Sequence, residues 1–310
     1  MTAGGSGEAA PERAAESGDT VIVWGEVLWD RLPDGDQLGG APANFAWHLG
    51  QAGGWARLVS RVGADEDGRR ALAQLALHVD TSLVQIDPER ATGEVTVRLE
   101  AGEPRYTLHR GRAWERIQCT EAARLAIEEA SVLVYGTLAQ RTAEGLEAWR
   151  EAVRAADGTC LRVCDLNLRP ADQDAPALRE AVDAADVVKL NDREVAMLRA
   201  WFGWADPVAV LLRPGEGRRR VVAVTHGHAG STLYGDGAAI EIAGVPCAPG
   251  GDNVGCGDAY LALLVHGMTL GWDLETSGRV ASRWAAAVAG ARGATPRFED
   301  AQLAELLEPE

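Results

Sequence analysis

The amino-acid sequence predicts an α/β fold in which helices cover both faces of a mostly parallel sheet. Two observations support this prediction. From Glu121 onward, helical patterns alternate with short, almost wholly apolar strand patterns, as in a parallel sheet that is buried on both faces. Between residues 92 and 110 the pattern changes to alternating, β-branched segments, which are typical of a hairpin in a small additional sheet.

The first half of the chain supplies the beginning of this fold. TVIVWG (20–25) predicts a buried strand, and GGAPANFAWHLGQAGG (39–54) carries glycine and proline turn signals into a helical pattern. ARLVSRVG (56–63) predicts the next strand and residues 66–78 a helix, and TSLVQID (81–87) has the texture of a β segment. TGEVTVRLE and RYTLHR, which AGEP separates, form the predicted hairpin.

The second half repeats the strand and helix patterns. The predicted strands are SVLVYG (131–136), LRVCDLN (161–167), DVVKLN (186–191) and RRVVAVTHG (219–227), each followed by a helical stretch or a turn. AYLALLVHGM (259–268) predicts a further helix.

Polar residues follow several of these strands, and ligands of open parallel sheets bind beyond the carboxyl ends of the strands. A lone Asn or Asp at a strand end is more often a helix cap or a turn residue. Recurrence at several strand ends favours a site instead. The candidates are Asp30 after the first strand, Asp165, Asn167, Arg169, Asn191, Glu194, Thr225 and Gly227.

Length and charge narrow the class of protein. A chain of 310 residues with 46% hydrophobic residues can bury a large core, and we expect one domain over residues 20–310. The first 19 residues are small, polar and acidic, so we expect a disordered tail rather than a signal peptide. The net charge of −16 disfavours nucleic acid and anionic membranes as partners, because lysine and arginine hold phosphates.

Other sequence features exclude several kinds of site. Five scattered cysteines without a CxxC pair are typical of reduced thiols, and no apolar run approaches the roughly 18 residues that span a bilayer, so we expect a soluble cytoplasmic protein. The only lysine, Lys189, lies between Val188 and Leu190, which excludes a Walker-type phosphate loop. HExxH, GxSxG, metal-spaced Cys/His clusters and a complete dinucleotide fingerprint are also absent from the sequence.

The stretch GDNVGCGDAYL (251–261) places two glycines and Asp258 at the start of a predicted helix. Free N–H groups and the positive helix end favour an anion there, and glycine lets the backbone approach it closely. A carboxylate would repel that anion, so Asp258 fits better as a base that takes the proton of a hydroxyl attacking phosphorus. An ordinary aspartate cap is the alternative, and the motif alone does not decide between them.

Several motifs together resemble the ribokinase-like (PfkB) carbohydrate kinase family. DNVGCGD is similar to the family's D-[TS]-x-G-A-G-D signature, and GGAPANFAWHLGQAG is similar to its N-terminal glycine signature. Further matches are GEVLWD (25–30), SRVGADEDG (60–68), DLNLR (165–169), KLNDRE (189–194) and VTHGHAG (224–230). The resemblance extends from Thr20 to about Pro296. It implies a three-layer α/β/α ribokinase-like fold with a small β-sheet lid from about residues 26–38 and 91–112.

The resemblance implies that Asp258 is the general base of a phosphoryl transfer. The amides of the anion hole for the phosphoryl group then come from Gly255, Cys256 and Gly257. The positions that match the family's sugar-binding residues are Asp30, Gly39, Gly40 and Asn44. Carboxylate and amide side chains suit vicinal hydroxyls, because together they accept and donate hydrogen bonds. Arg169 is a candidate for neutralising charge near the phosphate or the substrate, and a structural ion pair is the equal alternative.

The cofactors that the resemblance implies are ATP and Mg²⁺. Asn191 and Glu194 match the N-x-x-E motif, which organises magnesium and the ATP phosphates through water, in keeping with the waters that Mg²⁺ retains. Thr225 and Gly227 match a strand end that contacts nucleotide phosphates in relatives. Lys189 is a candidate for reaching a phosphate of ATP, and a solvated strand-end lysine is its alternative.

Many family members also hold a monovalent cation beside the anion hole. For K⁺, Asp252 is the candidate carboxylate ligand here, together with carbonyl groups of the loop near Gly293. Three residues depart from the family pattern, namely Asn253 for Thr or Ser, Cys256 for Ala, and His228 for a frequent Glu.

Cys256 has two interpretations. The residue is tolerated if its sulfur points into the core, because backbone amides form the anion hole whatever the side chain. The alternative is a reactive thiol, because helix N-termini lower the pKa of cysteine. We assign His228 no role.

The resemblance also suggests an assembly and a substrate. The hairpin fits a lid that closes over the sugar and excludes water, and a homodimer through this lid is a hypothesis. GEVLWD, GGAPANFA and YGTLAQR (135–141) are most similar to the fructokinase branch. We therefore expect ATP-dependent phosphorylation of D-fructose at its 6-hydroxyl.

Alternative functions remain open at this point. Within the family they are ribokinase and 2-keto-3-deoxygluconate kinase, and the second would need a cation such as Arg110 or Arg169 for its substrate carboxylate. A nucleoside kinase is less favoured. A catalytically silent sugar-binding protein on the same fold is the alternative of a different class. Asp258, Asn191 and Glu194 argue against it, because a binding module needs no base.

Overall fold

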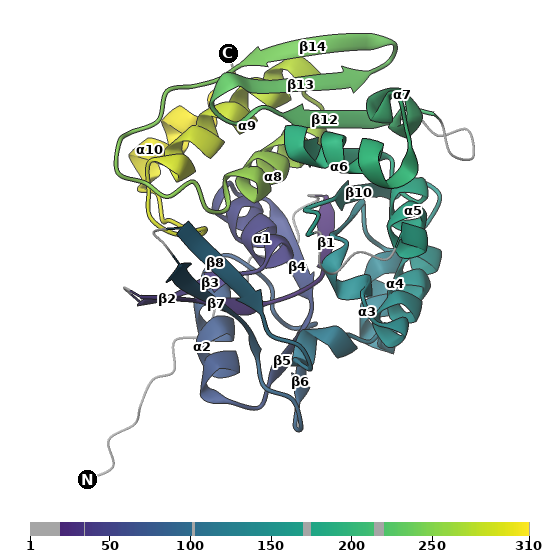
Figure 1. Cartoon of the computed structure of the whole chain (residues 1–310), viewed down its shortest axis with the longest axis vertical. Helices are drawn as coiled ribbons and strands as arrows, with labels where there is room; N and C mark the ends of the chain where they lie inside the picture. The colour runs from purple at the N-terminus through teal and green to yellow at the C-terminus, as the bar shows by residue number, and fades with distance from the viewer. Residues whose placement is uncertain (1–18, 34, 101–102, 170–174, 214–219, 310) are drawn as a thin grey trace.

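The computed structural model describes residues 19–33, 35–100, 103–169, 175–213 and 220–309 (Figure 1), so the predicted tail lies outside the described residues apart from Asp19. An eight-stranded sheet forms the centre, in the order β14-β13-β12-β11-β10-β9-β1-β4. Its pairs are parallel from β4 to β12, whereas β13 and β14 are antiparallel, which confirms a mostly parallel sheet. The strands are β1 (Thr20–Trp24), β4 (Trp55–Val59), β9 (Val132–Tyr135), β10 (Leu161–Asp165), β11 (Val187–Asn191), β12 (Val221–Thr225), β13 (Gly230–Gly235) and β14 (Ala238–Ala243).

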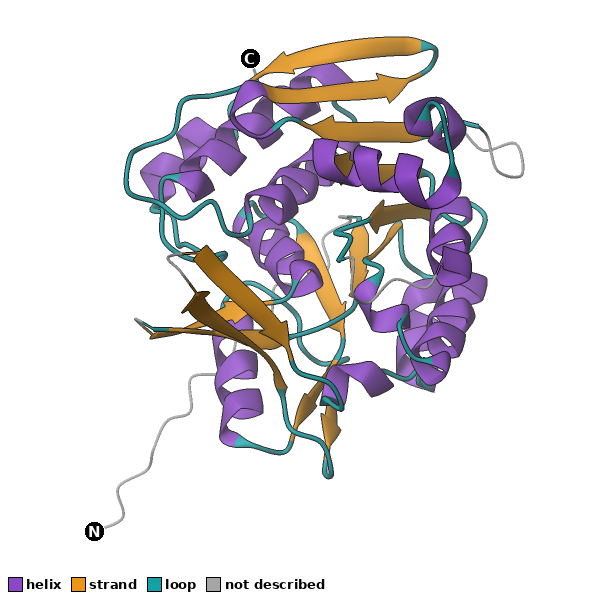
Figure 2. Ribbon diagram, in the orientation of Figure 1, coloured by secondary structure: helices purple, strands orange, loops and turns teal. Residues whose placement is uncertain are grey.

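Helices cover both faces of this sheet (Figure 2), as predicted. Alternate strand residues face two separate apolar clusters, because successive side chains of a strand point to opposite faces. One cluster packs against α1 (Ala41–Gln51), α8 (Cys256–Thr269) and α9 (Leu274–Ala289). The other packs against α3 (Glu121–Glu128), α4 (Ala143–Ala155), α5 (Ala175–Asp183), α6 (Asp192–Phe202) and α7 (Pro207–Leu211). Short 3₁₀ turns lie at Ala113–Arg116, Leu138–Gln140 and Gly227–Ala229, and α10 is Asp300–Leu306.

A four-stranded sheet stands apart from the large one, next to α2 (Glu66–Leu75) (Figure 1). Its order is β3-β2-β7-β8, with β2 (Leu28–Leu32), β3 (Gly35–Gly39), β7 (Gly93–Glu100) and β8 (Glu103–Leu108). The predicted hairpin is confirmed as the antiparallel pair of β7 and β8. The indole N–H of Trp29 donates to the carbonyl of Asp67 at 3.0 Å and so attaches the small sheet to α2.

Two predicted elements differ from the observed ones. The strand predicted over residues 56–63 is two strands, because β1 ends at Trp24, opposite Val59, and offers no partner beyond that point. The chain turns at Ser60, and β5 (Arg61–Gly63) pairs instead with β6 (Gln85–Asp87). The helix predicted to reach residue 78 ends at Leu75, where a turn follows. Among the described residues, we find no helix with the length and apolar character needed to cross a membrane.

A buried histidine joins α1 to the chain that follows α9. His48 is fully buried, and burial lowers its pKa to about 4, so the ring is neutral at pH 7. Its Nε2 lies 2.8 Å from the carbonyl oxygen of Ala294, which can only accept, so Nε2 carries the proton. Nδ1 then accepts from the indole N–H of Trp284 at 3.1 Å. These hydrogen bonds fix Ala294 relative to α1, which carries His48, and α9, which carries Trp284.

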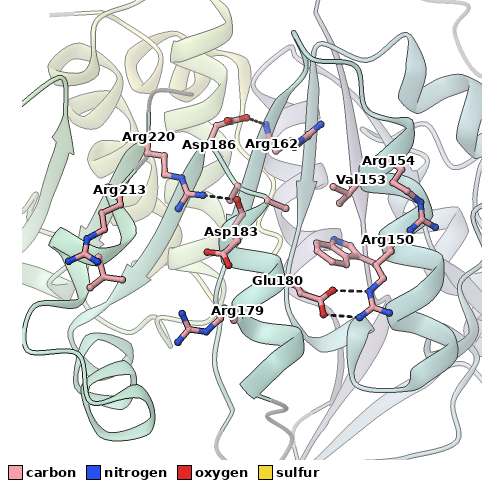
Figure 3. Close-up of a pocket in the computed structure, with 14 residues that line it drawn as sticks. Arg150, Val153, Arg154, Arg162, Arg179, Glu180, Asp183, Asp186, Arg213 and Arg220 are labelled. Atoms are coloured by element: carbon pink, nitrogen blue, oxygen red, sulfur yellow. Dashed lines mark hydrogen bonds and ion pairs between the residues drawn. The ribbon is translucent and has the colours of Figure 1, made fainter. Parts of the chain in front are cut away.

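An arginine-lined pocket of about 720 Å³ lies at the amino ends of β10, β11 and β12 (Figure 3). Arg220 donates to the carbonyl oxygens of Leu211 at 3.3 Å and Asp183 at 2.6 Å, which are the last residues of α7 and α5. Arg162 donates to Ala156, just after α4, and Arg150 pairs with Glu180. Helix carboxyl ends leave carbonyl groups without intrahelical donors and carry partial negative charge. These arginines therefore serve the fold.

Replacing Arg220 by methionine is expected to lower the free energy of unfolding by about 1–3 kcal/mol, because helix-end carbonyl groups lose their donor. Arg213→Met is the matched control, since Arg213 is exposed on the same pocket and its side chain makes no hydrogen bond or ion pair to any described residue. The control should change stability by less than about 0.5 kcal/mol. Urea unfolding followed by tryptophan fluorescence measures both, and equal effects would contradict this role for Arg220.

Candidate active site

The amino end of α8 is shaped by glycines that leave its backbone N–H groups accessible. Gly255 adopts a left-handed conformation, with φ at 76°, and no described side chain caps the helix. A Cβ atom on Gly255 would lie 2.7 Å from Cα of Ala294, which His48 holds in place. A larger residue therefore does not fit, and the first N–H groups of α8 remain available to an anion.

Asp258 lies in the first turn of α8 and is 9% exposed. Its Oδ2 accepts a hydrogen bond of 2.8 Å from the side-chain amide of Asn44 in α1, which packs beside α8 (Figure 1). Burial and then the negative charge of Asp165 raise the pKa of Asp258 to about 7, against the lowering influence of Lys189 and Asn44. A carboxylate with this pKa can both take and release a proton near neutral pH.

Lys189 and Asp165 form an ion pair in the interior, next to this turn. Nζ of Lys189 lies 3.1 Å and 3.2 Å from the two carboxylate oxygens of Asp165. Burial alone lowers the pKa of Lys189, but the carboxylates around it outweigh burial and raise that pKa. The alternative of a solvated lysine is therefore wrong, since Lys189 is only 5% exposed. Direct contact of its ammonium with a phosphate of ATP stays a prediction.

Asn191 and Glu194 lie together at the beginning of α6. Asn191 caps the helix by accepting from the N–H of Glu194 at 3.1 Å, and Glu194 accepts from the N–H of Asn191 at 2.7 Å. The second oxygen of Glu194 accepts from the N–H of Leu168 at 2.7 Å, and burial raises the pKa of this carboxyl. The helix-cap interpretation of Asn191 is thus confirmed. The predicted magnesium role requires the remaining lone pairs of these oxygens.

The predicted sugar-binding residues come together where the small sheet meets α1. Asp30 lies within β2 of the small sheet, so the expectation that it directly follows the first strand of the large sheet is wrong: the chain bends at Gly25 and enters a second sheet. Gly39 and Gly40 leave no room for side chains, because a Cβ atom would clash with Asp30 at the first and with the carbonyl oxygen of Glu26 at the second. Burial raises the pKa of Asp30 to about 6, against the effect of Arg169.

Two buried polar groups beside Asp258 are notable. Oδ1 of Asn44 has no hydrogen-bond partner among the described residues, so it can accept from a hydroxyl group. Glu26 is 2% exposed, and burial raises its pKa, opposed first by Arg169. Glu26 had no predicted role, although it lies in the GEVLWD motif. The sequence does carry a signal for Glu26, because a charged residue between the apolar segments TVIVW and VLW is unusual and points to a functional role.

The remaining predicted residues lie around the same end of the large sheet. Thr225 is the last residue of β12, and Gly227, with φ at 59°, begins the 3₁₀ turn after it. Asp252 accepts from the N–H of Gly293 at 2.9 Å, so the two predicted parts of the cation site are adjacent. Asn253 has φ at 58°, a conformation that asparagine adopts more readily than a β-branched threonine. His228 is exposed. In the described part of the chain, no three His, Cys, Asp or Glu residues cluster as metal ligands.

Cys256 is half-buried and packs against the apolar cluster that α8 shares with the sheet, which supports the core interpretation. Burial raises its pKa to about 12. Loss of solvation and the nearby charge of Asp258 both disfavour the thiolate, which argues against the alternative of a thiol activated by the helix end.

Comparisons with known proteins agree with this geometry. The model of the pfkB family of carbohydrate kinases matches residues 35–301. A fructokinase of Klebsiella pneumoniae is 30% identical over 268 residues, which cover 80% of this chain and 84% of that protein. The structure of a sugar kinase from Pyrococcus horikoshii in complex with ATP is 26% identical, with a TM-score of 0.81 over 92% of this chain and 97% of the other. A Vibrio cholerae fructokinase with fructose, ADP and calcium is 25% identical, with a TM-score of 0.77 over 94% and 100% of the two chains.

The thiol of Cys256 is expected to resist alkylation, because a pKa of about 12 leaves almost no thiolate at neutral pH. Cys247, which is exposed, should react with iodoacetamide well before Cys256. Peptide mass spectrometry after timed labelling of the native protein measures both sites, and Cys247→Ser identifies the fast one. Preferential labelling of Cys256 would contradict its placement in the core.

Proposed function

The chain belongs to the pfkB family of carbohydrate kinases, and on this premise we propose that it transfers the γ-phosphate of ATP to the 6-hydroxyl of D-fructose. The observation that carries the proposal is the placement of Asp258, a buried carboxylate whose pKa is raised to about 7, in the helix turn that presents free N–H groups. A base and an anion site then lie within one turn of α8. Phosphoryl transfer to an alcohol needs both.

In the proposed reaction, the acceptor hydroxyl donates a hydrogen bond to Asp258. Its oxygen attacks the γ-phosphorus as the proton passes to the carboxylate, the bond to the bridging oxygen breaks, and ADP leaves. The N–H groups of residues 255–257 stabilise the charge on the transferring group. Asn44 fixes the orientation of Asp258 through its amide.

We propose that Mg²⁺ and the nucleotide bind at the end of the sheet that carries the carboxyl ends of β11 and β12. The side-chain donors of Asn191 and Glu194 are oxygens, the type that Mg²⁺ prefers. Glu194 is buried, which suits an ion that keeps several waters and is contacted through them. Asn191 and Glu194 would hold the hydrated ion, which neutralises charge on the phosphates of ATP. Thr225 and Gly227 would face the phosphates, and Asp252 with the Gly293 loop would hold K⁺.

The charges around the acceptor site favour an uncharged sugar. Glu26 and Asp258 are buried and Asp30 is half-buried, and Arg169 is a cation that acts on both Glu26 and Asp30. A substrate carboxylate would meet repulsion there, whereas hydroxyl groups can donate to these oxygens. This balance supports a neutral ketose over 2-keto-3-deoxygluconate.

The small sheet is the proposed lid. Asp30 in β2 would contact the sugar, and closure would remove water, which competes as a phosphoryl acceptor. A homodimer through this sheet is proposed from the family resemblance alone, and light scattering at micromolar protein tests it.

Asp258→Asn is expected to lower kcat at least about 100-fold, because the amide keeps the shape of the side chain but cannot take the proton. Sugar binding measured by calorimetry should largely survive. Asp300→Asn is the matched control, since Asp300 is exposed at the beginning of α10 and should keep full activity. Equal turnover by wild type and Asp258→Asn would remove Asp258 from the mechanism.

The second test is a substrate panel. ADP release with Mg²⁺ and K⁺ present should give the highest kcat/KM for fructose, lower values for ribose and glucose, and the lowest for 2-keto-3-deoxygluconate, with adenosine as a nucleoside control. A preference for the sugar acid would contradict the argument from buried carboxyl groups. Sugar binding without turnover across the panel would favour the silent binding protein.

A further inference from the structure

The Lys189–Asp165 pair has no part in the transfer scheme above, yet it lies directly behind the amino end of α8. The two residues are neighbours on adjacent strands, with Asp165 at the end of β10 opposite Lys189 in β11. Their side chains are 8% and 6% exposed. A buried ion pair of this kind seldom stabilises a fold more than an apolar pair of the same volume does, since both charges lose their solvation. Its presence therefore calls for another explanation.

The identity of the cation is also informative. Lys189 is the only lysine in a chain that has 30 basic residues in all. A Cβ atom on Gly257 would lie 2.7 Å from its Nζ, so the ammonium touches the backbone of the first turn of α8. A guanidinium is larger and planar, and would not fit this position as an ammonium does. The structure thus places a compact positive charge against the turn that carries Asp258.

Four groups from four separate segments face Asp258. Asp165 of β10 and Glu26 before β2 bring negative charge, Lys189 of β11 brings positive charge, and Asn44 of α1 donates a hydrogen bond. Cys256 precedes it on the same helix as a neutral thiol. The net field at Asp258 therefore depends on how Asp165 and Lys189 balance one another.

We propose that Asp165 and Lys189 are positioning residues for the base: the pair holds a compact positive charge against Gly257, which keeps α8 at its distance from β11, and it sets the balance of charge around Asp258. This inference rests on the proposed function. It goes beyond a phosphate contact for Lys189, because both residues act through Asp258 and through Gly257. Asp165 has the stronger influence of the two on Asp258.

The sign of each effect follows from the charges. Removing the negative charge of Asp165 makes the charged form of Asp258 more favourable, so its pKa falls and activity persists to lower pH. Removing the positive charge of Lys189 has the opposite effect. Lys189→Met alone is not decisive, because it leaves Asp165 buried without its partner, which is destabilising in itself. The order of substitutions matters for this reason.

The test compares the acidic limb of the kcat profile in Asp165→Asn, in the double variant Asp165→Asn/Lys189→Met, and in the wild type. Asp165→Asn should move the limb about 1 pH unit lower, and the added Lys189→Met should move it back towards, without passing, the wild-type position. Asparagine retains an oxygen that accepts from Lys189. The double variant removes both charges of the pair and leaves neither unpaired, so we expect it to fold even if the single variant does not. The titration of ATP itself is common to all of them.

Arg220→Met, a destabilised variant at the far edge of the sheet, controls for loss of stability and should leave the limb in place. The inference fails if the limb stays within about 0.2 pH unit of the wild type in both Asp165 variants, or if Asp165→Asn moves it upward.

¹³C NMR of aspartate-labelled protein gives the same answer without turnover, with Asp258→Asn identifying the resonance. If no sugar is phosphorylated but this resonance shifts as described, the proposed function fails and the electrostatic inference stands. A resonance that titrates identically in all the proteins overturns the inference alone.

Discussion

The architecture of the site depends on the close approach of the amino end of α8 to its surroundings. Gly255 meets Ala294, and Gly257 meets the ammonium of Lys189, with no side chain between them. This close approach leaves helix N–H groups free and places Asp258 in the interior. Burial there raises the pKa of Asp258 to about 7, so the carboxyl group can exchange a proton near neutral pH. Asn44 then reaches the carboxylate from α1, and His48 of the same helix holds Ala294 in place. One helix thus orients the base and supports the loop behind it.

Charged residues have different roles at the amino ends and at the carboxyl ends of the strands of the large sheet. At the amino ends of the strands, Arg162 and Arg220 donate to carbonyl groups at helix ends, so positive charge meets the negative ends of helices and stabilises the fold. At the carboxyl ends of the strands, Asp258 and Glu194 are buried, and the positive charge of Lys189 partly balances their negative charge. Burial there raises the pKa of the carboxyl groups of Glu194 and Asp258, which is costly for stability and useful for proton transfer.

Much of the fold could be predicted from the sequence, because apolar runs such as VLVY and DVVKL are buried on both faces and admit few other interpretations. The anion site before Asp258 could also be predicted from the sequence, because glycines at the start of a helix leave its first N–H groups without a capping side chain. The division at Ser60 could not be predicted, because it depends on where the neighbouring strand ends. Lys189 was unpredictable too, since its burial is set by Asp165, which is distant in sequence. Side-chain environments of this kind arise only from tertiary contacts.

The central claim is that Asp258 takes the proton of a sugar hydroxyl while the adjacent turn holds the transferring phosphate. A crystal structure with fructose, Mg²⁺ and a non-hydrolysable ATP analogue tests it most directly. We expect the 6-hydroxyl oxygen at a hydrogen-bond distance of about 2.6–3.2 Å from the Asp258 carboxylate, with the γ-phosphate over the N–H groups of residues 255–257. A sugar whose nearest carboxylate is Asp30, with Asp258 facing only protein, would contradict the account.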